Sequence, residues 1–233
     1  MRVLSRDEQN RFMSYLLTDM DSCKFGLLLA LSTGVRIGEL CALQWCNINI
    51  REQTIKIAAT LQRLHDTDMQ GETRTRIVIG EPKSDTSART IPMISYLADL
   101  CKQMDPGNMG AYVLTGTTDY MEPRTLQYQY QALLKATGIP YRNFHVLRHT
   151  YASRCVERGV DVKSLSEMLG HTDVRTTLQV YVHSSLEHKM RVIQSICFLA
   201  PVLDPDCSPS PSPSDHPEAP RYQQFLTTLS QMG

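Results

Sequence analysis

The sequence predicts an α+β fold that is mostly α-helical and contains a small three-stranded antiparallel sheet. Three observations predict this class. Helix-start and helix-stop residues bracket most apolar segments of residues 1–199. Runs of β-branched residues occur together only between residues 54 and 93. A chain of 233 residues, 42% of them hydrophobic, is also long enough to bury a sizeable core.

The first three helices follow from their boundaries. Ser5 and Glu8 have the spacing of a capping box, so we expect a helix to begin there. The next apolar segment, CKFGLLLALSTG, ends at Gly34 and is expected to form a helix at the centre of the core. In the following VRIGELCALQW, apolar residues recur at helical spacing, which predicts a short helix with Arg36 at its start.

The predicted sheet comes from three short runs. TIKIAAT, TRIVIG and RTIPM, at residues 54–60, 75–80 and 89–93, are rich in β-branched residues and are separated by polar or glycine- and proline-containing segments. Lys83 lies in the connection between the last two runs. We expect these runs to form the antiparallel sheet.

Helices are expected again after the sheet. Their approximate ranges are 93–104, 123–137, 145–158, 162–169 and 173 to beyond Tyr181. Glycines follow three of them directly, at Gly138, Gly159 and Gly170, and favour sharp helix ends.

We expect three regions along the chain: residues 1–199 as one catalytic domain, 200–220 as a linker and 221–233 as a tail. The linker is dense in proline and serine and cannot build a core. The tail has apolar residues at the spacing of an amphipathic helix, although a frayed end is an equally good interpretation. These residues are Tyr222, Phe225, Leu226 and Leu229.

Net charge does not identify a partner. The chain has 24 basic and 24 acidic residues, and the acidic excess of residues 200–233 leaves a balance of +3 for the first 199. That balance permits nucleic-acid binding without indicating it.

The seven cysteines include no CxxC pair, which is typical of reduced thiols in a cytoplasm. No apolar run approaches the roughly 18 residues that span a bilayer. We expect a cytoplasmic protein with no membrane partner.

A group of polar residues is expected to converge. His145 and Arg148 are three apart and should share one helix face, while Leu147, Tyr151 and Cys155 should take the opposite, buried face. The two helices that follow are short and end at glycines. The chain should therefore double back and bring His171, and then Tyr181, to the same region.

The residue types point to phosphoryl transfer. Arginine binds the non-bridging oxygens of a phosphate and stabilises the added charge of its transition state. A tyrosine nucleophile has a reference pKa of about 10 and needs cationic neighbours and a proton acceptor. His145 could be that acceptor. The sequence offers no paired carboxylates and no metal cage for other chemistry.

Four motifs in order and spacing resemble the catalytic domain of the tyrosine recombinases, also called the phage integrase family. They are TGVRIGEL, HVLRHTYAS, MLGHTDVRTTLQVYVH and the lysine loop GEPKSDTSARTIPM, and the resemblance covers roughly residues 1–190. The sequence of the lysine loop is most similar to those of integrases of conjugative transposons.

This resemblance implies site-specific DNA recombination, as integration or excision, without metal, cofactor or ATP. Tyr181 would attack a DNA phosphodiester and form a 3′-phosphotyrosine link. Arg36 and Arg148 would bind the phosphate, with a hydrogen bond from His171. Lys83 would protonate the leaving 5′-oxygen, and His145 would assist proton transfer at the tyrosine.

Other interpretations stay open for single residues and for the whole chain. Arg36 and Glu39 could simply form an intrahelical ion pair, Lys83 could be a solvated turn residue, and Tyr181 a half-buried aromatic residue. We take His149 and His183 as structural or supporting residues. A zinc protease would use His145 and His149, but Val146 stands where its glutamate is needed. A type IB topoisomerase and a catalytically inactive DNA-binding regulator on the same fold are further alternatives.

The resemblance also implies partners. We expect double-stranded DNA, a homo-oligomer on DNA such as a tetrameric synapse, and accessory DNA-bending or directionality proteins. Complete integrases usually carry an N-terminal core-binding domain, and we expect this chain to be a fragment or a short form without it. Binding should then be weakly specific and salt-dependent. The tail could dock on a neighbouring protomer or on its own.

Overall fold

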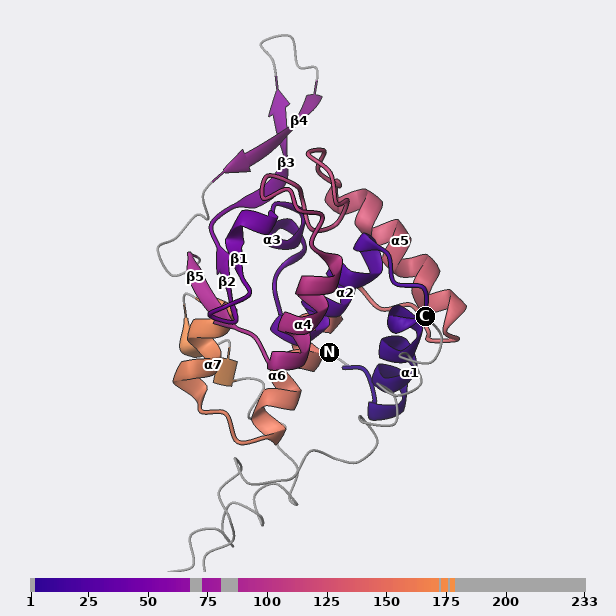
Figure 1. Ribbon diagram of the computed structural model, residues 1–233, viewed down its shortest axis with the longest axis vertical. Helices are drawn as coiled ribbons and strands as arrows, with labels where there is room; N and C mark the ends of the chain where they lie inside the picture. Colours follow the sequence, from indigo (N-terminus) through magenta and orange to yellow (C-terminus); the bar gives the residue numbers. More distant parts are fainter. Residues whose placement is uncertain (1–2, 68–72, 81–87, 172, 176, 179–233) are drawn as a thin grey trace, which may run out of the picture. The chain divides into compact units, whose positions relative to one another are not determined.

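The structure is a computed structural model that describes residues 3–67, 73–80, 88–171, 173–175 and 177–178 (Figure 1). Met1–Ser184 form one compact unit; the second unit, Ser185–Gly233, lies outside the described residues. The predicted fold class, α+β and mostly helical with a small three-stranded antiparallel sheet, is confirmed. The elements of the first unit are α1 (Arg6–Leu17), α2 (Ser22–Thr33), α3 (Ile37–Cys41), η1 (Trp45–Asn47), β1 (Ile48–Asn49), β2 (Thr54–Ile57), β3 (Thr60–Thr67), β4 (Thr73–Gly80), β5 (Arg89–Pro92), α4 (Ser95–Met104), α5 (Pro123–Ala136), α6 (His145–Glu157) and α7 (Val162–Leu169).

Helix α2 is the centre of the core, as its apolar sequence predicts. Phe25, Leu27 and Leu29 are completely buried, and α2 contacts α1, α3, α4 and α6. Gly34 ends the helix in the left-handed conformation, with φ of 70°, which glycine adopts without a Cβ clash. At this point the chain turns sharply into α3, so that Arg36 comes to lie beside the end of α2.

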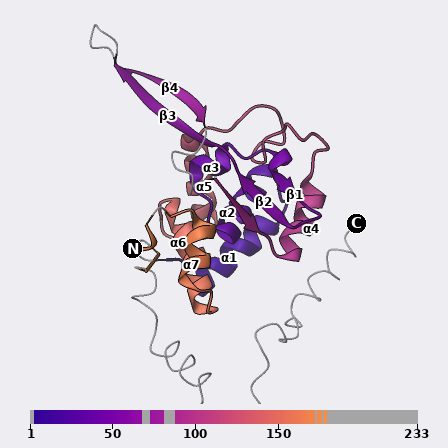
Figure 2. The same cartoon turned by 90° about the vertical axis from the view of Figure 1, so that its left-hand side faces the viewer.

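The strands differ from the prediction in their pairing. The three-stranded sheet has the order β1-β2-β5, and β3 and β4 form a separate two-stranded ribbon. The run at 75–80 was therefore wrongly assigned to the main sheet, because β4 pairs along its whole length with β3, for which no strand was expected. Ile55 and Ile91 face each other in the main sheet and are both fully buried, so burial selects β5 as the partner of β2. The ribbon extends away from the helices (Figures 1 and 2).

Helices α6 and α7 form the part of the unit that carries most of the predicted site. The two lie side by side (Figure 1) and bury a second hydrophobic cluster of Ala152, Val156, Leu165 and Leu169. Asp161 caps α7 through the backbone N–H of Ser164, and Gly170 closes it with φ of 65°. This tight closure directs His171 back toward the ends of α2 and α3.

Only part of the last predicted helix can be compared. Val174, Arg175, Thr177 and Leu178 are helical, which confirms its start. Tyr181, the linker 200–220 and the tail 221–233 lie outside the described residues, and so does Lys83. In the described part of the chain, no helix is both long and apolar enough to cross a membrane.

Candidate functional site

Arg36 lies at the first turn of α3 and connects it to the end of α7. Its Nη1 donates to Oε1 of Glu39 at 2.8 Å, and its Nη2 donates to the carbonyl oxygen of Gly170 at 2.7 Å. The intrahelical ion pair considered for Arg36 and Glu39 is therefore present. About a third of the Arg36 side chain, 33%, remains exposed, so the guanidinium can still meet a ligand.

Arg148 is buried, which corrects the expectation that it shares an outward face with His145. It is 5% exposed, and its Nη1 and Nη2 donate to the carbonyl oxygens of Gly34 and Leu169, each at 2.7 Å. The long side chain crosses from α6 to the carboxyl ends of α2 and α7, which carry partial negative charge. Helical spacing alone could not show this reach. Burial and the nearby charge of Arg36 lower the pKa of Arg148 to about 9.

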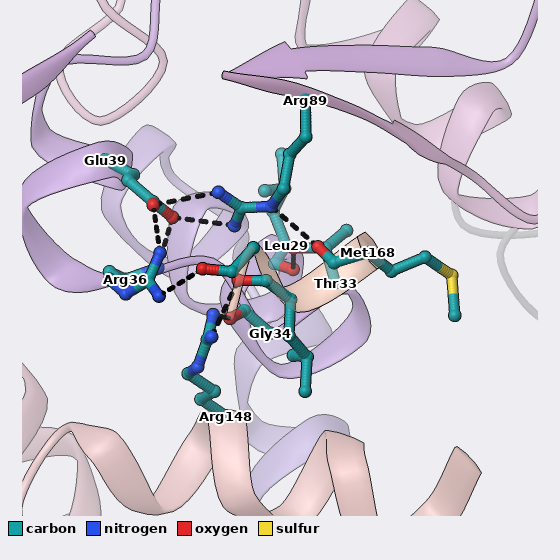
Figure 3. A network of polar contacts seen from close by, with 10 residues as sticks. Leu29, Thr33, Gly34, Arg36, Glu39, Arg89, Arg148 and Met168 are labelled. Carbon is teal, nitrogen blue, oxygen red and sulfur yellow. Dashed lines mark hydrogen bonds and ion pairs between the residues drawn. The ribbon is translucent and has the colours of Figure 1, made fainter. Parts of the chain in front are cut away.

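Arg89 is a third arginine of the site, and the sequence reasoning missed it. Its Nη1 and Nη2 donate to the two carboxylate oxygens of Glu39 at 2.9 and 2.8 Å, and its Nε donates to the carbonyl oxygen of Met168 at 2.7 Å. Figure 3 shows Glu39 between the guanidinium groups of Arg36 and Arg89. The only signal in the sequence was the position of Arg89, six residues after Lys83 in the same motif.

The cluster carries more positive than negative charge. We call Arg36, Glu39, Arg89 and Arg148 the arginine cluster; Arg36 and Arg89 donate to the carboxylate of Glu39, and the charge of Glu39 also acts on Arg148. Burial favours a raised pKa for Glu39, but the hydrogen bonds and charge of Arg89, together with Arg36, hold that pKa below its usual value. Glu39 is therefore ionised, and these four residues together carry two more positive charges than negative ones. An excess of positive charge favours the binding of an anion.

His171 stands beside the arginine cluster in its neutral form. It follows Gly170, the residue that Arg36 bonds, and its Nδ1 lies 2.8 Å from Oγ1 of Thr177. Burial and the charges of Arg148, Arg36 and Arg89 lower the pKa of His171 to about 4. The imidazole is therefore uncharged at pH 7 and can offer one hydrogen bond without adding charge.

His145 begins α6, three residues before Arg148. Partial burial, followed by the charges of Arg148 and Arg36, lowers its pKa. A neutral imidazole can accept a proton. The rings of His145 and His149 are 6.3 Å apart. Within the described residues no group of three potential metal ligands gathers, so the zinc interpretation gains no third ligand there.

The structure therefore brings together four of the six predicted site residues: Arg36, His145, Arg148 and His171. Lys83 and Tyr181 lie outside the described residues. Arg89 and Thr177 join the group, and neither was singled out from the sequence. A phosphate-sized anion held at this place would meet fixed guanidinium groups, a neutral donor and a neutral proton acceptor.

Comparison with known proteins gives consistent similarities. Residues 2–188 match the family described as the phage integrase family. The chain is 29% identical over 185 residues to a "Tyrosine recombinase XerC-like" protein of Caldanaerobacter subterraneus subsp. tengcongensis, covering 72% of this chain and 47% of that relative. The chain thus spans about half the length of this relative.

Two solved structures share the fold. The Tn1549 transposon integrase, solved in complex with transposon right end DNA, superposes with a TM-score of 0.65 at 22% identity and covers 83% of this chain and 65% of that one. The catalytic domain of bacteriophage HP1 integrase superposes with a TM-score of 0.54 at 18% identity, covering 91% of this chain and 99% of that domain.

Proposed function

The chain belongs to the phage integrase family, and from this premise we propose that it catalyses site-specific recombination of double-stranded DNA. In this proposal residues 1–199 are the catalytic domain of a tyrosine recombinase that cuts and rejoins strands through a 3′-phosphotyrosine intermediate. The observation that carries the proposal is the arginine cluster, because its fixed guanidinium groups suit the oxygens of a phosphodiester, whose negative charge grows in the transition state.

The guanidinium groups have hydrogen-bond donors to spare for a phosphate. An arginine has five N–H donors, and Arg36 and Arg148 each use two nitrogens on protein oxygens in the described part of the chain. The remaining N–H groups would bind the non-bridging oxygens, with His171 adding one more donor. The protein oxygens fix the two groups before substrate arrives, so little reorganisation accompanies the reaction.

The proposed cleavage step exchanges one phosphoester for another. The phenol oxygen of Tyr181 bonds to phosphorus, and the bond from phosphorus to the 5′-oxygen breaks. His145 accepts the phenol proton, for which its lowered pKa provides the neutral form. Lys83 donates a proton to the leaving 5′-oxygen. The phosphotyrosine link then reacts with the 5′-hydroxyl of a partner strand, which restores Tyr181. The roles of Lys83 and Tyr181 rest on the family resemblance.

The partners belong to the same proposal. We infer a homo-oligomer on DNA, because strand exchange needs two cleaved duplexes, and we keep the tail 221–233 as a docking segment on its linker. The closer likeness to conjugative-transposon integrases stays a prediction. If deletion of residues 200–233 leaves the size of the protein–DNA assembly unchanged, the docking role of the tail is wrong.

A nicked suicide substrate tests the function. After cleavage near the nick a short fragment diffuses away, so the covalent protein–DNA adduct accumulates and survives denaturation. Wild-type protein should form this adduct, also in the presence of a chelator. Tyr181→Phe should abolish it, and Arg148→Ala should reduce it by orders of magnitude.

Tyr141→Phe is the matched control, because Tyr141 is 65% exposed and lies outside the cluster. This variant should form the adduct like the wild type. Adduct formation by Tyr181→Phe would refute the assigned nucleophile. DNA binding by the wild type without any adduct would identify an inactive DNA-binding regulator instead.

A further inference from the structure

Thr177 has a buried hydroxyl directed at the imidazole of His171. The residue is 0% exposed, and its Oγ1 lies 2.8 Å from Nδ1 of His171, a normal hydrogen-bond length. The two residues belong to different local structures. His171 follows the end of α7, and Thr177 lies in the helical segment that begins at Val174.

Burial and the neighbours of His171 leave its imidazole neutral. Burial is the main cause of its lowered pKa, and the charges of Arg148, Arg36 and Arg89, followed by that of His149, act in the same direction. A neutral imidazole carries one proton, on Nδ1 or on Nε2, and the hydrogen bond at one nitrogen decides which. Thr177 therefore determines what the opposite nitrogen, Nε2, can do.

The direction of the hydrogen bond follows because a buried hydroxyl group requires an acceptor for its hydrogen. Two other threonines donate to a carbonyl oxygen four residues earlier: Thr33 of α2 to Leu29, and Thr137, at the carboxyl end of α5, to Leu133. Among the described residues, Thr177 has Nδ1 of His171 as its hydrogen-bond partner. If Nδ1 carried the proton, the hydroxyl hydrogen would lack an acceptor there, which is costly in a buried site. The hydroxyl therefore donates to Nδ1.

We propose that Thr177 is a positioning residue that holds His171 as the tautomer protonated on Nε2. His171 then presents an N–H group to the scissile phosphate as a neutral donor with a fixed ring plane. This role in catalysis rests on the proposed function, whereas the tautomer itself is a property of the protein without DNA. With the opposite tautomer, Nε2 would present a lone pair to the phosphate oxygens and repel them.

The first test is nitrogen NMR of the protein without DNA. Two-bond proton–nitrogen correlations distinguish the two tautomers and the imidazolium, and His171→Gln identifies the signals of His171. We expect wild type and Thr177→Ser to show the proton on Nε2 at pH 7. Thr177→Val should show a mixture of tautomers. A proton on Nδ1 in the wild type, or an imidazolium, would overturn the proposal whatever the protein does to DNA.

The second test measures adduct formation in a single turnover on the suicide substrate. Thr177→Val should slow it by about tenfold or more, which corresponds to the loss of one hydrogen bond in the transition state. Thr177→Ser should stay within about threefold of the wild type. In a His171→Ala background Thr177→Val should cause no further loss, because the threonine acts through the histidine.

Thr150→Val is the control for loss of a buried hydroxyl. Thr150 is also 0% exposed, and its hydroxyl accepts a hydrogen bond from the backbone N–H of Leu4 rather than contacting His171. It should lower thermal stability without slowing the adduct step selectively. Equal rates for Thr177→Val and wild type would overturn the catalytic part of the proposal. Failure of the wild type to form any adduct would count against the proposed function, and the NMR result would still decide the tautomer.

Discussion

Arg89 and Glu39 form a two-pronged ion pair in the protein interior, with their side chains 5% and 3% exposed. The two bonds measure 2.9 and 2.8 Å, and the same carboxylate also accepts from Arg36. Glu39 thus couples strand β5 to helix α3. Arg89 and Arg36 also donate to the carbonyl oxygens of Met168 and Gly170. Through these two arginines the Glu39 carboxylate therefore connects β5, α3 and the carboxyl end of α7 around the candidate phosphate site.

Glu39→Gln should destabilise the fold strongly. The change leaves Arg36, Arg89 and Arg148 without their shared counter-charge, and breaking a buried ion pair from one side costs about 3–5 kcal/mol. Urea unfolding at pH 7 measures the difference. Asp99→Asn is the control, because its pair with Lys102 is 62% and 64% exposed and should contribute at most about 1 kcal/mol. Similar losses in both variants would show that Glu39 does not organise the cluster.

Arg89→Lys should impair adduct formation although it conserves charge. A lysine has no planar fork to bond both oxygens of Glu39 and cannot also reach the carbonyl of Met168, so Glu39 would hold Arg36 less firmly. We expect the single-turnover rate of adduct formation to fall by about tenfold or more. Arg6→Lys is the matched control, since Arg6 is 70% exposed in a pair with Glu157. A wild-type rate for Arg89→Lys would limit Arg89 to a structural role.

Local signals in the sequence predicted most helices. The capping box of Ser5 and Glu8 is present, and Gly34 and Gly170 end their helices in the left-handed conformation. These features depend on residues close in the chain, so a linear reading detects them. The helical start after His171 was also predicted.

Longer-range features escaped prediction for a physical reason. The pairing of β4 with β3, rather than with the main sheet, depends on which strands bury their apolar face. Helical periodicity does not show that the Arg148 side chain reaches the carboxyl ends of α2 and α7. The role of Arg89 depends on its bond to Glu39, 50 positions earlier. Thr177 likewise becomes visible only once the turn at Gly170 has brought His171 back toward it. The spacing of residues along the chain does not show which side chains meet between folded elements.

The stability of the protein should fall on acidification, in part through His171. Its folded pKa of about 4 lies below the unfolded value of about 6.5, so the unfolded state binds more protons between these values. The contribution is complete above pH 6.5 and is lost as the pH falls toward 4. After allowance for partial solvent screening, we expect a loss of roughly 1–2 kcal/mol.

Urea unfolding of wild type and His171→Asn at pH 7 and pH 4.5 isolates this effect. The variant lacks the titrating group, so its stability should fall less than that of the wild type, while the other histidines titrate in both proteins. Parallel losses in the two proteins would mean that His171 does not have a depressed pKa.

Sulfate should stabilise the protein more than chloride at equal ionic strength, even without DNA. A tetrahedral dianion resembles a phosphodiester in its oxygens and would neutralise the two excess charges of the arginine cluster, whereas general screening is the same for both salts. A ligand at ten times its dissociation constant adds about 1.4 kcal/mol to the stability of the folded state.

Arg36→Gln should lose most of this difference, because Arg36 is the partly exposed guanidinium of the cluster, with 33% of its side chain accessible. Arg6→Gln removes an exposed arginine elsewhere and should keep the full response. Thermal unfolding in matched sulfate and chloride buffers measures the shift for each protein. An equal sulfate effect in both variants would place the anion away from the cluster and would remove the main support for a phosphate site there.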